Sequence, residues 1–309
     1  MADKMATRQA YGKALVELGA KMPNLVVMDA DLSKSTMTAE FGKAYPERFF
    51  NMGIAEQNLY GAAAGLALSG KVVCASTFAM FATGRAFEII RNSIGYTKAN
   101  VKICATHAGI TVGEDGASHQ TFEDIALMRT IPGMTVINPS DGVSAKKLLQ
   151  QAVEMYGPCY VRLGRAAVPV FYDENAEITL GKANTVRDGR DVTVIATGIM
   201  VNEAVIAAEQ LAAEGIDVRV IDIHTIKPID SEAIIKAAQE TKAIVTAEEH
   251  SVIGGLGSAV AEVVVRNAPV KMAMVGQQDT YGESGKPDQL KEKYGMTAKD
   301  IAAAVKSVL

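Results

Sequence analysis

Short apolar segments alternate with longer amphipathic segments along the chain. The apolar segments are rich in β-branched residues, which is typical of strands buried on both faces of a parallel sheet. The predicted strands are residues 24–29, 71–76, 101–106, 134–138 and 159–163 in the first half, and 191–197, 217–223, 243–249 and 270–275 in the second. The predicted helices are residues 8–18, 56–68, 84–94, 142–155, 202–214, 231–240, 256–265 and 297–308. This alternation predicts an α/β fold with two parallel-sheet domains.

The stretch between residues 166 and 190 interrupts the alternation. It has weak periodicity, contains Pro169 and is rich in polar residues. Such a composition is typical of a connection rather than of a strand or helix. We therefore predict a first domain over residues 1–170, a linker over residues 171–190 and a second domain over residues 191–309.

Composition and charge narrow the classes of function. The chain has 309 residues, 49% hydrophobic and 21% charged, with a net charge of −4, so a basic nucleic-acid face is not expected. No uncharged apolar stretch reaches the roughly 20 residues of a membrane span. The three cysteines form no CxxC pair, so a structural zinc site is not expected either. With no signal peptide recognised, we expect a cytoplasmic protein.

Polar residues follow the predicted strands of the first half. Asp29 ends the first strand, Ser76 the second, and Thr106 and His107 the third, while Arg165 follows the fifth. Ligands of open α/β sheets bind beyond the carboxyl ends of the strands. The sequence therefore predicts a site at this edge of the first domain.

Two segments carry candidate chemistry. In residues 51–68, Glu56 opens a helix of small and apolar residues, where a structural acid favoured by the helix dipole is the alternative interpretation. Residues 105–124 form a glycine-rich segment with His107 and His119, which are half of the chain's four histidines. Glycine lets a backbone approach a ligand closely. Because the two histidines lack HxH or HxxxH spacing, we do not expect them to bind metal.

Four motifs taken together resemble the second half of transketolase. They are GIAEQN at 53–58, STFAMF at 76–81, THAGITVGEDGASHQ at 106–120 and YGESGKPDQL at 281–290. The resemblance extends from about residue 8 to the C-terminus. It implies a pyrimidine-binding domain for thiamine diphosphate, followed by a transketolase C-terminal domain. It also implies transfer of a two-carbon ketol unit from a ketose phosphate to an aldose phosphate.

The resemblance implies roles for single residues at the cofactor. Glu56 is similar to the glutamate that holds N1′ of the aminopyrimidine ring, and is thus both a cofactor-binding and a catalytic candidate. Phe78 and Phe81 are similar to aromatic residues that pack against that ring. Gly84 stands where a third aromatic residue is expected, which implies a looser aromatic pocket.

The resemblance also implies a substrate site. His107 and His119 are similar to active-site histidines near the sugar donor, and Asp115 is similar to an aspartate that contacts the sugar C2 hydroxyl. The residues that resemble the grip on the sugar phosphate are Arg8, Ser35 and Arg165. Arg165 is preferred over Arg162 because of its RxxxP spacing to Pro169.

Full-length transketolases begin with a domain that binds the diphosphate through Mg²⁺ and carries a GDG motif. No GDG occurs in this sequence. The expectation is a partner: a separate N-terminal transketolase subunit that supplies the diphosphate and Mg²⁺ site, in an α₂β₂ assembly.

Three alternatives remain open. A β subunit of a 2-oxoacid dehydrogenase E1 component has a similar layout, but the GEDGASHQ loop with its two histidines argues against it. A deoxyxylulose-phosphate-synthase-like subunit resembles the loop but differs at the preceding THAG. A catalytically silent partner subunit is disfavoured by the presence of Glu56.

Overall fold

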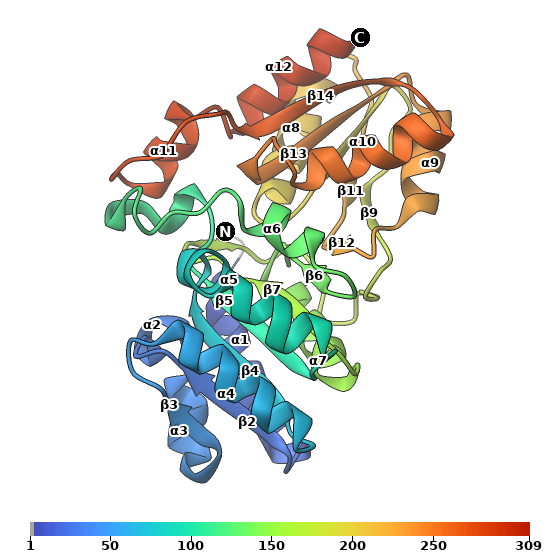
Figure 1. Cartoon of the computed structure of the whole chain (residues 1–309). Coiled ribbons are helices and arrows are strands. Elements are labelled where there is room, and N and C mark those ends of the chain that lie inside the picture. Colours follow the sequence, from blue (N-terminus) through green and yellow to red (C-terminus); the bar gives the residue numbers. More distant parts are fainter. Residues whose placement is uncertain (1–2) are drawn as a thin grey trace.

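A computed structural model describes residues 3–309 and shows two α/β domains, one at each end of the molecule (Figure 1). The first domain has a seven-stranded sheet in the order β12-β6-β7-β5-β4-β2-β3, and the second a five-stranded sheet in the order β14-β13-β10-β11-β9. Neighbouring central strands run parallel in both sheets. The prediction of two parallel-sheet α/β domains is confirmed.

The first sheet is covered on both faces. Its strands are β2 (Leu25–Asp29), β3 (Phe49–Asn51), β4 (Val72–Phe78), β5 (Val101–Thr106), β6 (Thr135–Ile137), β7 (Cys159–Arg162) and β12 (Thr225–Lys227). Helices α1 (Thr7–Lys21) and α7 (Gly142–Glu154) share one apolar core with the sheet. Helix α4 (Glu56–Leu68) and the helical segment 81–96 share the other, so the strands are buried from both sides.

The second sheet is built in the same way. Its strands are β9 (Asn184–Arg187), β10 (Val192–Ala196), β11 (Val218–Asp222), β13 (Ala243–Ser251) and β14 (Lys271–Gln277). Helices α8 (Met200–Ala212) and α12 (Ala298–Val308) cover one face. Helices α9 (Ser231–Glu240) and α10 (Leu256–Asn267) cover the other, and their core is continuous with that of α4 in the first domain.

Short elements go beyond the periodic pattern. They are β1 (Lys4–Ala6), α2 (Ser33–Thr36), α3 (Ala39–Ala44), the 3₁₀ turn Pro46–Arg48, α6 (Asp124–Thr130), β8 (Ala167–Pro169) and α11 (Pro287–Lys293). Strands β9 and β12 join their sheets antiparallel. Strand β12 follows β11 in the chain yet pairs with β6 of the first sheet, and so ties the two domains together.

The predicted helix 84–94 lies within a longer helical segment that is only partly α-helical. Two π-helical stretches, Phe81–Arg85 and Ile90–Tyr96, flank the α-helical residues Phe87–Ile89. π-helical turns are rare and occur frequently at functional sites. The first stretch follows directly after β4, at the edge of the sheet where the sequence places a site.

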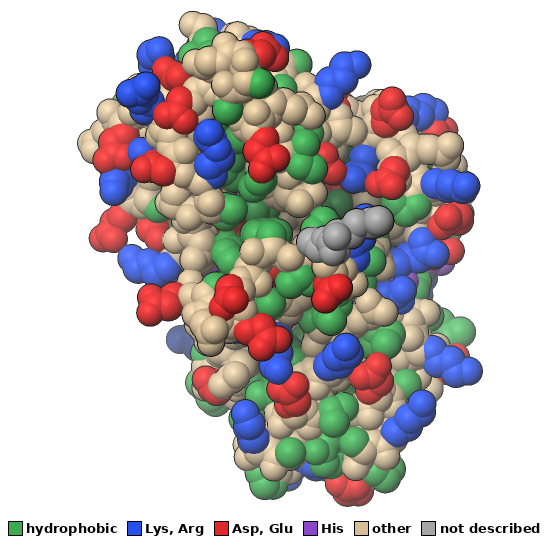
Figure 2. Space-filling model, turned by 180° about the vertical axis from the view of Figure 1, so that it is seen from behind, with side chains coloured by type: hydrophobic (Ala, Val, Ile, Leu, Met, Phe, Trp, Pro, Cys, Tyr) green, Lys and Arg blue, Asp and Glu red, His purple; other side chains and the backbone are tan. Residues whose placement is uncertain are grey.

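The surface has no single dominant charge on the face seen from behind. Figure 2 shows acidic and basic side chains interspersed over both domains on that face. Within residues 3–309, no helix combines the length and the apolar character needed to cross a bilayer. All three cysteines are free and buried.

Asp222, at the end of β11, joins three parts of the chain. Its Oδ2 accepts a hydrogen bond of 2.7 Å from the Ser140 hydroxyl of the first domain. The same oxygen accepts one of 3.0 Å from the Tyr172 hydroxyl, in the segment between the domains. Burial raises the pKa of the Asp222 carboxyl to about 7, because the charged form has lost its water.

Replacing Asp222 with Asn tests this burial. In the unfolded chain the carboxyl ionises near its ordinary pKa of 3.8, whereas the folded protein holds the proton until about pH 7. The Asp222 contribution to stability is therefore lost as pH rises between these values, and Asp222→Asn removes this loss. We expect the variant's free energy of unfolding to rise relative to wild type from about pH 4.5 to about pH 7.5, measured by urea denaturation. Asp173→Asn, at an exposed position, is the control, and parallel pH curves for Asp222→Asn and wild type would contradict the prediction.

Candidate active site

Glu56 lies at the first position of α4, directly after β3 and its connecting turn. Its side chain is 2% exposed, in a helix whose other buried residues are small or apolar apart from Tyr60. A carboxylate at a helix N-terminus is stabilised by the helix dipole. Its Oε2 accepts a hydrogen bond of 2.9 Å from Nη1 of Arg85, an arginine that the sequence analysis did not single out.

Four rings gather beyond the ends of β4 and β5, and Arg85, which pairs with Glu56, lies over one of them, Phe81. Phe78 stacks on His107 with ring centroids 3.8 Å apart, and on Phe81 with centroids 5.9 Å apart. The edge of His119 meets Phe81 at 5.4 Å between centroids. The predicted aromatic and histidine candidates are thus brought together, in a geometry typical of aromatic packing.

His107 is held in an unusual backbone conformation. Its φ of +58° lies in the left-handed region, which is uncommon outside glycine and is often found at functional sites. Its Nδ1 lies 2.9 Å from the Thr106 hydroxyl. Burial, followed by the charges of Arg8 and Arg165, lowers the pKa of His107 to about 3. The imidazole is therefore neutral at pH 7 and can accept a hydrogen bond.

Arg8 and Arg165 converge near His107 from the two ends of the first domain's sequence. Burial and the charge of Arg165 lower the pKa of Arg8, and its Nε has no hydrogen-bond partner among the described residues. Its Nη1 donates to the Ser35 carbonyl at 2.6 Å. Two like charges near a buried unsatisfied donor are costly unless an anion offsets them. These three predicted residues therefore form a candidate anion site.

Arg165 and Arg162 have different environments. Arg165 is about one-third exposed, and its Nη1 contacts the Val112 carbonyl at 2.8 Å and Glu114 at 2.9 Å. Arg162 is buried, and its Nε and Nη2 pair with Asp124 at 2.7 and 3.3 Å. Only Arg165 is free to reach a ligand without breaking a buried ion pair.

Glycines in the loop that carries Asp115 allow the second domain to approach. Gly109, Gly113 and Gly116 all have positive φ. A Cβ at Gly109 would collide with the Glu249 side chain, and one at Gly116 with Ser284. The sequence had suggested that these glycines let the loop approach a ligand, whereas the structure gives them a packing role. Asp115 itself is exposed at the surface of this loop.

Glu249 and Gln120 position the loop, and the sequence analysis assigned a role to neither. The Thr111 amide donates to Glu249 Oε1 at 2.6 Å, and Gln120 Nε2 donates to the Glu283 carbonyl at 2.9 Å. Both bonds cross from the first domain to the second. The only local signal was that Glu249 ends a predicted strand.

Asp29, at the end of β2, does not serve the site directly. The hydroxyls of Thr36 and Thr38 and the Leu32 amide all donate hydrogen bonds to its carboxylate.

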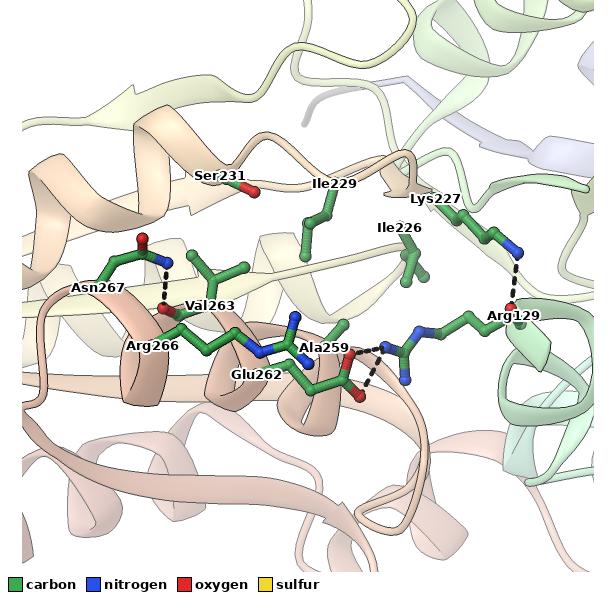
Figure 3. A pocket seen from close by; sticks show the side chains of 10 residues that line it. All are labelled: Arg129, Ile226, Lys227, Ile229, Ser231, Ala259, Glu262, Val263, Arg266 and Asn267. Atoms are coloured by element: carbon green, nitrogen blue, oxygen red, sulfur yellow. Dashed lines mark hydrogen bonds and ion pairs between the residues drawn. The ribbon is translucent and has the colours of Figure 1, made fainter. Parts of the chain in front are cut away.

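A separate cleft of about 290 Å³ lies between α6, β12, α9 and α10 (Figure 3). Its Arg129 is paired with Glu262 at 3.0 Å, and Lys227 Nζ donates to the carbonyls of Arg129 and Ile131. Most of its cationic groups are thus committed to protein acceptors. None of the predicted site residues lines it, so the ring cluster at the ends of β4 and β5 is the candidate active site.

The fold and the site define a two-domain α/β protein of the transketolase type. Residues 3–170 match the pyrimidine-binding domain of transketolase, and residues 181–301 match the transketolase C-terminal domain. The chain belongs to the transketolase family.

Relatives of similar length are subunits of split transketolases. The chain is 53% identical to a transketolase C-terminal section from Methanocaldococcus jannaschii, over 96% of this chain and 94% of the relative. It is 44% identical to the 6-deoxy-6-sulfo-D-fructose transketolase subunit of a Clostridium species, over 97% and 94%. Human transketolase is 39% identical, and there the chain spans 49% of the relative.

A solved structure of the same type matches almost the whole chain. It is a split-gene transketolase, described as an inactive beta4 tetramer, with 56% identity and a TM-score of 0.93. The match covers 99% of this chain and 98% of that one. The resemblance stated from sequence is therefore confirmed at the level of the family.

The two arginines should differ sharply in their effect on stability. Arg162→Met leaves Asp124 buried without its partner, which costs about 3–5 kcal/mol of unfolding free energy. Arg165→Met breaks a partly exposed pair and should cost at most about 1 kcal/mol. Urea denaturation of both variants checks this, and similar losses would show that the buried pair has no special structural role.

Proposed function

We propose that the chain is the pyrimidine-binding and C-terminal subunit of a thiamine-diphosphate-dependent transketolase. It transfers a two-carbon ketol unit from a ketose phosphate to an aldose phosphate, and is active only with a partner subunit that binds the diphosphate. The observation that carries the proposal is the gathering of Glu56, the stacked rings and the Arg8–Arg165 pair at one sheet edge.

The residues fit the aminopyrimidine half of the cofactor. The buried carboxyl of Glu56 would hold a ring nitrogen, and Phe78 and Phe81 would supply apolar faces beside the ring. Thiamine diphosphate, when bound, supplies a nucleophilic carbon that the protein's own side chains cannot provide. Glu56 would share a proton with that nitrogen and so act as an acid–base group.

The diphosphate and Mg²⁺ are assigned mainly to the partner. Among residues 3–309, no group of three or more His, Cys, Asp and Glu side chains is arranged to hold a metal ion. This chain spans about half the length of human transketolase, which therefore carries additional sequence. The split relatives of matching length support a two-subunit enzyme, for which we propose an α₂β₂ assembly.

His107 and His119 handle the hydroxyl groups of the sugar. A ketose presents a carbonyl and several hydroxyls, so its site needs neutral groups that can both donate and accept hydrogen bonds. The lowered pKa of His107 keeps that imidazole neutral at pH 7, so that it can accept a hydrogen bond from a sugar hydroxyl. Asp115, from the same loop, accepts a hydrogen bond from the C2 hydroxyl.

Arg8 and Arg165, with Ser35, bind the phosphate of the sugar. Guanidinium groups match phosphate geometry bidentately. Two relatives carry names of substrates with an anionic group, a sulfo sugar and apulose 4-phosphate, which supports an anion grip at this place. Xylulose 5-phosphate and ribose 5-phosphate, of the pentose phosphate pathway, are our first choice of donor and acceptor.

Oxoacid chemistry is the second candidate. A 2-oxoacid needs cations near its carboxylate, and Arg8 and Arg165 are cations. However, a 2-oxoacid lacks the chain of hydroxyl groups for which His107 and His119 supply neutral hydrogen-bonding partners. A ketose phosphate is therefore favoured over a 2-oxoacid.

Reconstitution tests the proposal. The chain is combined with a partner carrying the diphosphate-binding domain, Mg²⁺ and thiamine diphosphate, and ketol transfer from xylulose 5-phosphate is assayed beside CO₂ release from pyruvate. We expect transfer, little CO₂ release, and a loss of about 10²–10⁴-fold for Glu56→Gln, since the amide cannot share a proton. Brisk pyruvate decarboxylation without ketol transfer would favour an oxoacid or deoxyxylulose-type enzyme instead.

The anion grip makes its own prediction. Arg165→Ala should raise the KM for phosphorylated sugars by about 10–150-fold, the value of a hydrogen bond to a charged group, with a small effect on unphosphorylated analogues. Steady-state kinetics with both substrate types measures the difference. Lys71→Ala, at an exposed position just before β4 and so at the opposite end of that strand from the site, is the cationic control, and equal losses on both substrate types would rule out phosphate recognition by Arg165.

A further inference from the structure

The side chain that pairs with Glu56 in this chain is Arg85. Its guanidinium lies against both the Glu56 carboxylate and the Phe81 ring. Arg85 Nη1 lies 2.9 Å from Glu56 Oε2. The guanidinium carbon of Arg85 also lies over the Phe81 ring, 4.8 Å from its centroid. A flat, nitrogen-bearing group therefore donates to the carboxylate and covers the aromatic ring at the same time.

These are the two contacts that the proposed function requires of the aminopyrimidine. We propose that Arg85 occupies the place of the aminopyrimidine in the free subunit and is displaced when thiamine diphosphate binds. The inference rests on the proposed function, because only a cofactor in that place competes for both Glu56 and Phe81. Arg85 is thus a residue that controls occupancy of the site and takes no part in the chemistry.

The surroundings make Arg85 the member of the pair that can leave. The Arg85 side chain is 49% exposed, whereas the Glu56 side chain is 2% exposed. Partly exposed ion pairs are weak, since water competes for both charges. A guanidinium can swing into solvent by side-chain rotation alone, while Glu56 is fixed at the start of α4.

The local backbone leaves room for the arginine. Gly84 directly precedes Arg85 and contributes no side chain, and a Cβ placed there would meet only the end of Met80 within 4 Å. Both residues lie in the π-helical stretch Phe81–Arg85 that follows β4. Within this stretch, Arg85 is the residue whose guanidinium lies over the Phe81 ring.

Cofactor affinity tests the proposal directly. In the complex with the diphosphate-binding partner and Mg²⁺, the Kd of thiamine diphosphate is measured by calorimetry for wild type, Arg85→Gln and Arg91→Gln. Arg91 is an exposed arginine of the same helical segment that pairs with the Asn92 side chain, so it serves as the matched control. We expect Arg85→Gln to tighten binding by about two- to fivefold, the value of a partly exposed ion pair that need no longer be broken. Arg91→Gln should leave the Kd unchanged.

The outcomes separate this inference from the proposed function. Unchanged or weaker binding by Arg85→Gln would overturn the inference, since weaker binding would make Arg85 a ligand of the cofactor. A wild-type complex that binds no thiamine diphosphate would instead refute the proposed function.

A second measurement uses the isolated chain and needs no partner. Urea denaturation of Glu56→Gln, Arg85→Gln and the double variant gives the coupling between the two side chains. We expect a coupling of about two- to fivefold in the unfolding constant. Additive effects would show that the pair is not formed in the free subunit, and would overturn the inference.

Discussion

The shape of the candidate active site depends on one carboxylate from the second domain. Glu249, near the end of β13, accepts a hydrogen bond from the amide of Thr111. Thr111 lies in the loop between His107 and His119. Because Gly109 has no side chain, the Glu249 side chain can press against the loop backbone there. The loop between His107 and His119 is thereby tied to the second domain. The second domain therefore supports the loop of the site, although the candidate residues all belong to the first domain.

The Asp124–Arg162 pair strengthens this contact between the two domains. Arg162 binds Asp124 with two nitrogens and also donates to the Glu249 carbonyl at 2.9 Å. Burial alone would raise the pKa of the Asp124 carboxyl, but the charges of Arg162 and His250 and the hydrogen bonds from Arg162 and Tyr160 together outweigh it, so the pKa is lowered. The carboxylate form is thus retained inside the protein, and the ion pair holds β7, α6 and β13 together. A weak surface contact could not position a loop in this way.

Local sequence patterns predicted most of the framework. The helix that opens at Glu56 and the helix capped by Asp141 begin where expected, because apolar periodicity and capping residues are local signals. The pairing of Glu56 with Arg85, 29 residues away, and of Thr111 with Glu249, 138 residues away, could not be predicted in this way. Nor could the antiparallel edge strands β9 and β12, which are short and depend on a neighbouring strand for their hydrogen bonds. The family resemblance named the residues of the site but not what holds them before a ligand arrives.

The apolar core that runs without a break from α4 to α10 has a consequence for how the chain behaves as a whole. Domains with separate cores can open and close about a hinge, whereas a shared core must be disrupted before its two sides separate. Together with the β12–β6 pairing, this makes the two sheets one mechanical body. Adjustment to a partner subunit is therefore left to single side chains at the surface, and a stiff chain of this kind presents its half of a shared site already assembled.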